Sequence, residues 1–455
     1  MQSSDNPNGV RDLKKIATDI FSAGITAVDP ERCVKQCLRY HSHALSIGQV
    51  AYALNKINNI YLIGFGKASA AMALPVEAML GDRITDGLIV TKYGHGVALR
   101  HCRVIEAGHP VPDDNGARAA AALMGLVDTA NADDLIICMI SGGGSALTPA
   151  PAHGIDLADK QETTRLLLGC GADIHEINTI RKHLSTIKGG QLCRRANGAA
   201  MVSLILSDVI GDDLDIIASG ATAPDTATFD DCMEILSRYG LLEQVPESVS
   251  RHLSAGCRGQ VEETPKPGSD VFGNVYNHIV GSISHALTAA ENEARRQGFN
   301  PLVLSSTIQG EAREAAKVLS AVAREVRCAG RPIQPPACLL SGGETTVKLK
   351  GNGKGGRNME LALSAGIELA DAPRTLLLSA GTDGTDGPTD AAGAFADGST
   401  VFRADCLNLS AYRHLDNHDA YPFFQALGDL LVTGPTRTNV MDLQIVLVDT
   451  LEPQK

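Results

Sequence analysis

The sequence predicts an α/β protein with two α/β domains and mostly parallel sheets. Apolar runs that suit strands alternate with helical segments almost throughout the chain, and most of these runs end in loops rich in glycine or aspartate. Continuous apolar strands of this kind are typical of a parallel sheet that is covered on both faces. The length of 455 residues exceeds the roughly 250–300 residues at which one hydrophobic core stops growing, so we expect two domains.

The N-terminal domain is expected to be Rossmann-like and to span residues 1–260. A strand over 59–64, a glycine turn and a helix from about Ala68 begin the pattern, and the apolar runs in DDLIICMISGGGSAL and AAMVSLILSDVIGDD predict two further strands. The segment 257–276 has no periodicity and carries proline, glycine and charge, so it is the expected linker. Alternation then restarts, which predicts a C-terminal domain over 261–455.

Composition excludes several classes of protein. A hydrophobic content of 44% with 20% charged residues is ordinary for a globular chain, and a net charge of -12 opposes nucleic acid or an anionic membrane as a partner. No apolar run approaches the ~20 residues of a membrane span, and no signal peptide is recognisable, so a cytoplasmic location is expected. The sequence leaves open whether the chain is a monomer or a homo-oligomer.

Five polar loops follow predicted strands, where ligands bind in open α/β sheets. The loop GNGKGGRN combines bare main-chain N–H groups with cations, which suits phosphate oxygens. We therefore expect it to bind a nucleotide or phosphate through Gly353, Lys354, Gly355 and Gly356. The alternative is a hairpin with a solvated tip, because the residues just before it alternate as an exposed strand would.

Two N-terminal loops suggest further phosphate contacts. GFGKAS begins like a dinucleotide fingerprint, but Ser69 replaces the third glycine, so the loop offers only Gly66 and Lys67 at a helix start. ISGGGSAL lacks the spacing of a nucleophile elbow and fits backbone donors to an anion better. These donors are expected at Ser141, Gly142, Gly143, Gly144 and Ser145.

Acidic and basic clusters complete the candidate site. Where cations gather phosphates, carboxylates are needed for Mg²⁺, and one acid could also accept a hydroxyl proton. The candidate metal ligands are Asp208, Asp212, Asp383 and Asp386, with turn or helix-cap roles as the alternative. Arg181 and Lys188 could clamp a carboxylate, or could belong to a solvated basic face.

Eight motifs in order resemble those of the bacterial glycerate 2-kinases, whose C-terminal part is called the MOFRL domain. They include GFGKASAAMA, EAGHPVPDDNG, NTIRKHLSTIKGG, SGGETTVKLKGNGKGGRNMELAL and SAGTDGTDGPTDAAGA, and the likeness runs from about residue 10 to 448. The resemblance implies transfer of phosphate from ATP to the 2-hydroxyl of D-glycerate with Mg²⁺, in a cleft between two α/β domains. It also places the catalytic lysine and arginine at Lys67 and Arg357.

Further site residues and two alternatives complete the prediction. Asp208 is expected to be catalytic, and Glu344 and Asn439 to bind substrate. Family members read GPTGTN where this chain has Arg437 in GPTRTN, which puts a bulky cation in place of a glycine. Because members are often labelled hydroxypyruvate reductases, an NAD(P)H-dependent reductase is one alternative, although the incomplete fingerprint opposes it. A noncatalytic sugar-acid binding protein is the other.

Overall fold

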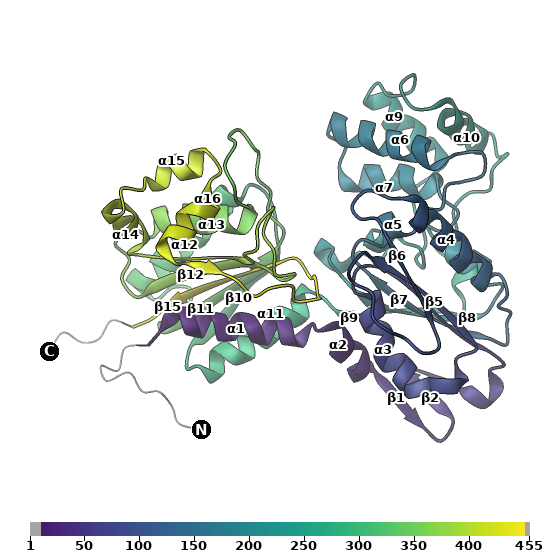
Figure 1. The fold of residues 1–455 in the computed structure, drawn as a ribbon, viewed down its shortest axis with the longest axis horizontal. Coiled ribbons are helices and arrows are strands. Elements are labelled where there is room, and N and C mark those ends of the chain that lie inside the picture. The colour runs from purple at the N-terminus through teal and green to yellow at the C-terminus, as the bar shows by residue number, and fades with distance from the viewer. Residues whose placement is uncertain (1–10, 451–455) are drawn as a thin grey trace. The chain divides into compact units, whose positions relative to one another are not determined.

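The protein, seen here in a computed structural model, is described over residues 11–450. It divides into two compact units (Figure 1). The central unit spans Pro30–Val280, and the terminal unit combines the chain before residue 30 with the chain from Gly281 onward. Each unit has a six-stranded sheet with helices packed on it, so the prediction of two α/β domains is confirmed.

The sheet of the central unit has the strand order β6-β5-β4-β7-β8-β9, and the pairs from β6 to β8 are parallel. Strand order reverses between β4 and β7, and ligands bind at such a switch point in open α/β sheets. Both strands are buried along their whole length, as their apolar runs predict. The bounds are β4 (Ile60–Phe65), β5 (Asp86–Lys92), β6 (Arg103–Ala107), β7 (Leu135–Ser141), β8 (Ala200–Leu206) and β9 (Val275–Gly281).

Helices of the central unit form two groups. One group flanks the sheet, namely α3 (Ser69–Leu80), α4 (Asp114–Val127) and α8 (Gln191–Arg195). The other has a hydrophobic core of its own, and Figure 1 shows it at the end of the sheet where β7 leads into α5 (Gly144–Leu147). This group consists of α6 (Leu157–Cys170), α7 (Ile174–His183), α9 (Phe229–Arg238) and α10 (Glu247–Cys257). It therefore lies on the side of the predicted ligand loops.

A small antiparallel sheet and one short helix complete the central unit: α2 (Pro30–Cys37), β1 (Leu38–His41), β2 (Ala44–Ile47) and β3 (Val50–Ala53). The expected linker at 257–276 is wrong, because this segment belongs to the central unit. Within it, the Glu263 carboxylate accepts a hydrogen bond from Phe229 N, and Thr264 Oγ1 donates to Asp225. Polar contacts hold this segment in place, and such contacts leave no hydrophobic periodicity in the sequence.

The sheet of the terminal unit is mixed rather than mostly parallel. Its order is β10-β11-β15-β12-β13-β14, and β10 with β11 is the one parallel pair among the described strands of this sheet. The last strand, β15, lies between β11 and β12 and runs antiparallel to both. The apolar run of β15 predicts that both faces of the strand are buried, but it does not predict the direction in which the strand runs. The bounds are β10 (Asn300–Ile308), β11 (Ala337–Gly343), β12 (Thr375–Gly381), β13 (Gly393–Asp397), β14 (Leu430–Leu431) and β15 (Asp442–Val448).

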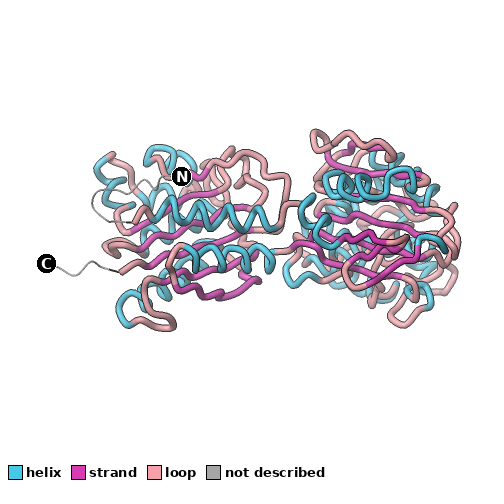
Figure 2. Tube along the Cα trace, turned by 90° about the horizontal axis from the view of Figure 1, so that it is seen from below, coloured by secondary structure: helices cyan, strands magenta, loops and turns pink. Residues whose placement is uncertain are grey.

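Helices cover both faces of this sheet, as Figures 1 and 2 show for the terminal unit. One face carries α1 (Leu13–Ala27) and α11 (Ile283–Arg296); the opposite face carries α12 (Ala312–Ala329), α13 (Arg357–Glu368), α14 (Thr400–Cys406), α15 (Ala411–Asp416) and α16 (Ala420–Leu427). The apolar face of α1 packs on α11, so α1 belongs to the terminal unit. The expected division at residue 260 had placed it in the N-terminal domain. The start of the chain therefore belongs with its end.

Candidate active site

Two predicted phosphate loops of the central unit touch at the switch point. Lys67, which follows β4, donates its backbone N–H to the carbonyl of Gly142 at 2.9 Å, and Ser141 Oγ accepts from Ala68 N at 2.9 Å. Because β4 and β7 are adjacent parallel strands, their C-terminal loops meet at one edge. The structure thus brings Gly66, Lys67 and the glycines after Ser141 together.

Asp208, just after β8, completes this edge. A Cβ added to Gly142 would collide with the Asp208 carboxylate, so a larger residue at this position would displace that carboxylate. Burial raises the pKa of Asp208, and the nearby Lys67 ammonium opposes that rise. A lysine and a carboxylate beside glycine N–H groups form a site that can bind both an anion and a cation.

His109 belongs to this site, although the sequence analysis did not assign it. A Cβ at Gly143 would lie 2.8 Å from His109 Cδ2, and Lys67 is also close. Burial, assisted by the Lys67 charge, lowers the pKa of His109 to about 4, so the imidazole is neutral at pH 7. The motif GHPVPDD was the only available signal, and it assigns no role to the histidine.

Lys188 lies against the glycine loop rather than on a solvated face, and Arg181 is close enough to affect its charge. Lys188 is 1% exposed, and its ammonium donates to the carbonyl of Ser145 at 3.0 Å. Burial lowers the pKa of Lys188, and the neighbouring Lys160 and Arg181 lower it further. Ser145 Oγ in turn lies 2.5 Å from Ser219 Oγ, another polar group that the sequence analysis did not select.

Their sequence neighbours have structural partners instead. Lys182 Nζ forms ion pairs with Asp215 at 3.0 Å and Asp225 at 3.1 Å. His183 Nε2 lies 2.8 Å from the Glu263 carboxylate. The basic segment therefore contains both structural and candidate ligand-binding cations, a distinction that spacing alone cannot make.

The predicted metal ligands lie in both units. Asp208 and Asp212 belong to the central unit, and Asp212 Oδ1 is buried without a hydrogen-bond partner among the described residues. Residues 11–450 contain no group of three or more His, Cys, Asp and Glu side chains that could hold a metal. Mg²⁺ usually takes only one or two protein carboxylates, together with water and phosphate oxygens. The Asp208 carboxylate and the orphan oxygen of Asp212 are oxygen donors of the kind that Mg²⁺ takes.

The acids of the terminal unit have turn and cap contacts. The Asp386 carboxylate accepts from the backbone N–H groups of Asn358 at 3.1 Å and Met359 at 2.8 Å, so it caps α13. Burial raises the pKa of Asp386 to about 6. Asp383 Oδ1 accepts from Thr385 N at 2.9 Å. These contacts match the alternative roles given above for glycine-spaced aspartates.

Arg357 begins α13 and is held by two carboxylates. Its Nε and Nη2 atoms donate to Asp442 at 2.6 and 2.9 Å, and its Nη1 lies 2.7 Å from Glu344. Burial opposes the charge, but the hydrogen bonds with Asp442 outweigh it and raise the pKa of Arg357. Asp442 was not selected from the sequence, since an acid before an apolar run carries no distinct signal. The guanidinium is thus fixed in orientation.

A pocket of about 470 Å³ adjoins this arginine. Gly353, Gly355 and Gly356 line it together with Glu344 and Arg357, so the glycines expected to bind an anion share a pocket with one cation and one acid. The Lys354 ammonium lies 4.4 Å from the centroid of the Tyr421 ring, a cation–π geometry. The solvated-hairpin alternative is wrong, since the residues before the loop form no strand.

Asn439 and Arg437 lie in the loop before β15. Asn439 Oδ1 accepts from Met441 N at 3.1 Å, so this amide oxygen holds a turn. Arg437 is exposed and has φ +66°, a left-handed conformation that glycine adopts more easily. The backbone therefore explains why a glycine suits this position.

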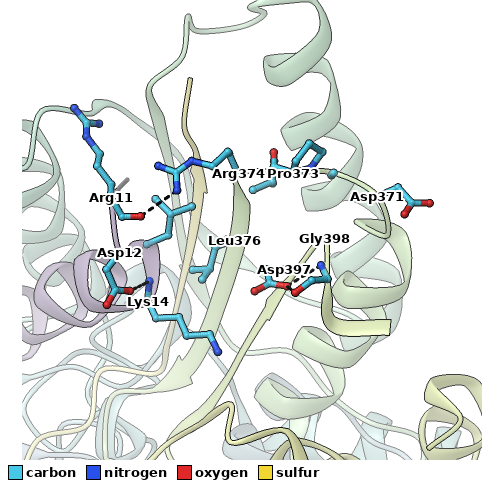
Figure 3. A pocket seen from close by; sticks show the side chains of 13 residues that line it. Arg11, Asp12, Lys14, Asp371, Pro373, Arg374, Leu376, Asp397 and Gly398 are labelled. Carbon is cyan, nitrogen blue, oxygen red and sulfur yellow. Dashed lines mark hydrogen bonds between the residues drawn. The ribbon is translucent and has the colours of Figure 1, made fainter. Parts of the chain in front are cut away.

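The terminal unit has a second, larger pocket of about 620 Å³, shown in Figure 3. Arg374, which lines it, donates to the carbonyl of Arg11 and pairs with Asp449, and Lys14 pairs with Asp429. Its cations already have carboxylate partners, and no glycine-rich strand-end loop reaches it. Size alone does not make it the candidate site.

Comparison with known proteins gives the family. Residues 16–254 match a family described as domain of unknown function DUF4147, and residues 337–442 match the MOFRL family. The D-glycerate 2-kinase of Thermotoga maritima is 43% identical, covering 96% of this chain and 98% of that protein. The glycerate 2-kinase of Pyrococcus horikoshii is 41% identical with the same coverage.

A solved structure agrees with these relatives. The crystal structure of glycerate kinase from Thermotoga maritima superposes with a TM-score of 0.85 at 42% identity, covering 96% of this chain and 99% of that one. The likeness thus extends over both units. With its DUF4147 and MOFRL regions in order and relatives above 40% identity over nearly its full length, the chain belongs to the glycerate 2-kinase family.

Proposed function

We propose that this chain phosphorylates D-glycerate at its 2-hydroxyl, using ATP and giving 2-phosphoglycerate and ADP. The observation that carries the proposal is the meeting of Lys67, the glycine loop and Asp208 at the switch point, in a chain 43% identical to a D-glycerate 2-kinase. Phosphoryl transfer requires mainly positioning and charge stabilisation. Main-chain donors, fixed cations and carboxylates supply both.

In the central unit, we assign substrate and transition-state contacts. Arg181 and Lys188 would bind the carboxylate of glycerate, while Lys67 and the N–H groups of residues 141–145 would stabilise phosphate oxygens. The 2-hydroxyl oxygen forms its bond to the γ-phosphorus as the bond to the ADP oxygen breaks, and the hydroxyl proton passes to Asp208. Asp208 and Asp212 would hold Mg²⁺, which neutralises charge on the phosphates.

In the terminal unit, Arg357 is proposed to stabilise the negative charge on the equatorial oxygens of the transferred phosphoryl group. Asp442 holds the guanidinium plane, which supports this role, because an oriented donor costs no reorganisation during reaction. The loop from Gly353 to Gly356 would bind nucleotide phosphates. We still predict that Glu344 and Asn439 contact the substrate. We also predict that Asp383 and Asp386 bind the metal.

Location and assembly also stay predictions. No helix within residues 11–450 combines the length and the apolar character needed to cross a membrane. A cytoplasmic enzyme that works on small molecules, as a monomer or a homo-oligomer, remains the proposal.

The test is a direct comparison of activities in the purified protein. We expect ADP to form from ATP only when D-glycerate and Mg²⁺ are present, and we expect no oxidation of NADH or NADPH with hydroxypyruvate. Reductase activity without ADP formation would establish the first alternative. Calorimetric binding of glycerate with neither activity would establish the noncatalytic alternative.

A further inference from the structure

Lys160, on α6, is a buried lysine that the proposed reaction does not yet use. Its side chain packs inward with Thr163 and Leu167 and the residue is 6% exposed. Its ammonium donates to the carbonyl of Leu184, at the end of α7, at 3.0 Å. A lysine ammonium has three N–H donors, so one carbonyl does not satisfy it.

Lys160 belongs to a cluster of three cations without carboxylate partners. Within the described part of the chain, no Asp or Glu forms an ion pair with Lys160, Arg181 or Lys188. Burial, together with the charge of Arg181, lowers the pKa of Lys160 to about 7. Burial also lowers the pKa of Lys188, and the charges of Lys160 and Arg181 contribute to that decrease. Like charges gathered in a buried place destabilise the protein unless an anion joins them.

Lys182, which follows Arg181 on α7, provides the contrast. It is as deeply buried as Lys188, yet two carboxylates, Asp215 and Asp225, lie within 3.1 Å of its ammonium. This fold therefore supplies acids to a buried lysine that has a structural role. Their absence around the three-cation cluster points to a ligand as the missing partner.

The cluster adjoins groups that suit a hydroxylated ligand. Lys188 bonds the carbonyl of Ser145, and the hydroxyl of Ser145 begins a chain through Ser219 Oγ to Asn178 Oδ1 at 3.0 Å. Hydroxyls can donate or accept, so this chain can pair with a hydroxyl of a ligand. The glycine loop that contains Ser145 also contains Gly142, which contacts Lys67.

We propose that Lys160, Arg181 and Lys188 form one site for the carboxylate of a short hydroxy acid, in which Lys160 is a specificity-determining residue. The planar fork of Arg181 suits a carboxylate in bidentate geometry, and the two lysines act as point charges. That the acid is glycerate rests on the proposed function. The site itself rests on two buried lysines and a partly buried arginine that form no ion pair among the described residues.

The test compares Lys160→Met and Lys160→Arg with the wild-type protein. We expect Lys160→Met to raise KM for D-glycerate by about 10-fold or more, the loss of one charged hydrogen bond, and to change KM for ATP by less than about 3-fold. Lys160→Arg should keep most of the affinity. Without ligand, Lys160→Met should melt at the same temperature as wild type or higher, since an uncompensated charge is removed.

Lys182→Met is the matched control, and it should lower the melting temperature because it leaves Asp225 buried without its cation. A rise in KM for ATP instead of glycerate would show that the cluster serves nucleotide phosphate and would overturn the proposal. A fall in melting temperature for Lys160→Met with unchanged KM would show a structural lysine.

A binding assay separates this proposal from the proposed reaction. D-glycerate should raise the melting temperature of the wild-type protein, glycerol should not, and Lys160→Met should reduce the shift at the same D-glycerate concentration. If that pattern appears in a protein without kinase activity, the carboxylate site stands and the kinase assignment fails. If the kinase is active while Lys160→Met keeps both KM and the glycerate shift, the carboxylate site fails alone.

Discussion

At the scale of residues, the chemistry depends on a few side chains held against bare backbone. Gly142 packs so closely on Asp208 that a methyl group would not fit, and Lys67 reaches the same place from the next strand. The raised pKa of Asp208 has burial as its main cause and Lys67 as its main opponent. This carboxylate is suited to accept a cation or a proton, because either relieves its desolvation.

The metal role of Asp208 can be tested by Asp208→Asn. We expect the Mg²⁺ concentration for half-maximal activity to rise by about 10-fold or more, roughly 1.4 kcal/mol of binding free energy, because a neutral amide binds the ion less well. Asp213→Asn, an exposed acid in the same loop, is the control and should behave as wild type. An unchanged Mg²⁺ requirement in Asp208→Asn would remove this residue from metal binding.

The buried charge of Lys160 predicts a pH dependence of stability. Its pKa falls from 10.5 to about 7 on folding, and the charged groups that contribute nearby, Arg181 and Lys188, are both cationic. Below about pH 7 both states bind the proton and the penalty is fully present. Between about 7 and 10.5 the unfolded state binds more protons, so the free energy of unfolding rises with pH.

Urea unfolding of wild type and Lys160→Met checks that sign. The variant should be the more stable protein at about pH 6, and its advantage should shrink toward about pH 9 as the wild-type lysine loses its proton. An advantage that does not change with pH would contradict a buried, titrating Lys160.

At the scale of elements, the start of one helix and the start of one strand form a unit. Arg357 is the first residue of α13 and Asp442 the first residue of β15, and two hydrogen bonds join them. Asp386 caps the same helix through its backbone N–H groups. The glycine loop before α13 is therefore anchored at the residue proposed to contact the transferred phosphate.

Asp442→Asn tests this anchoring. An amide has only one acceptor oxygen and cannot accept the two parallel hydrogen bonds of the guanidinium on two oxygens, so we expect kcat to fall by about 10-fold or more while KM for glycerate changes little. The partly exposed Glu344 is the comparison, and Glu344→Gln should have a smaller effect. Equal losses in the two variants would contradict an orienting role specific to Asp442.

Elements also show how far sequence reasoning reaches. The strand expected at 59–64 is observed at Ile60–Phe65, and its helix begins at Ser69, because long apolar runs and glycine turns are strong local signals. The direction of β15 and the place of α1 depend on contacts between distant segments, which local pattern does not encode. Lys160 and Asp442 could not be selected from the sequence for a similar reason, because the burial of a charged side chain is visible only in the folded structure.

At the scale of the whole molecule, the net charge of -12 opposes the approach of anionic substrates, so local cations must attract them. Each unit contributes a glycine loop with a basic residue: Lys67 in the central unit and Arg357 in the terminal unit. The proposed reaction assigns to each of these residues the stabilisation of phosphate oxygens.

A double-mutant cycle of Lys67→Ala and Arg357→Ala tests these two assignments. Each single variant should lower kcat/KM by about 100-fold or more, near 2.7 kcal/mol, and the double variant should lose much less than the product of the two. Lys56→Ala, an exposed lysine of the central unit, should keep full activity. Strictly multiplicative losses would indicate that the two residues act on independent steps.

The central claim is phosphoryl transfer to the 2-hydroxyl, and a coupled assay tests it most directly. Enolase converts 2-phosphoglycerate to phosphoenolpyruvate, which pyruvate kinase and lactate dehydrogenase then report as NADH oxidation. With D-glycerate, ATP and Mg²⁺, we expect the signal to appear without phosphoglycerate mutase and to vanish when D-glycerate is omitted. A signal that appears only after the mutase is added would place the phosphate on the 3-hydroxyl and contradict the account.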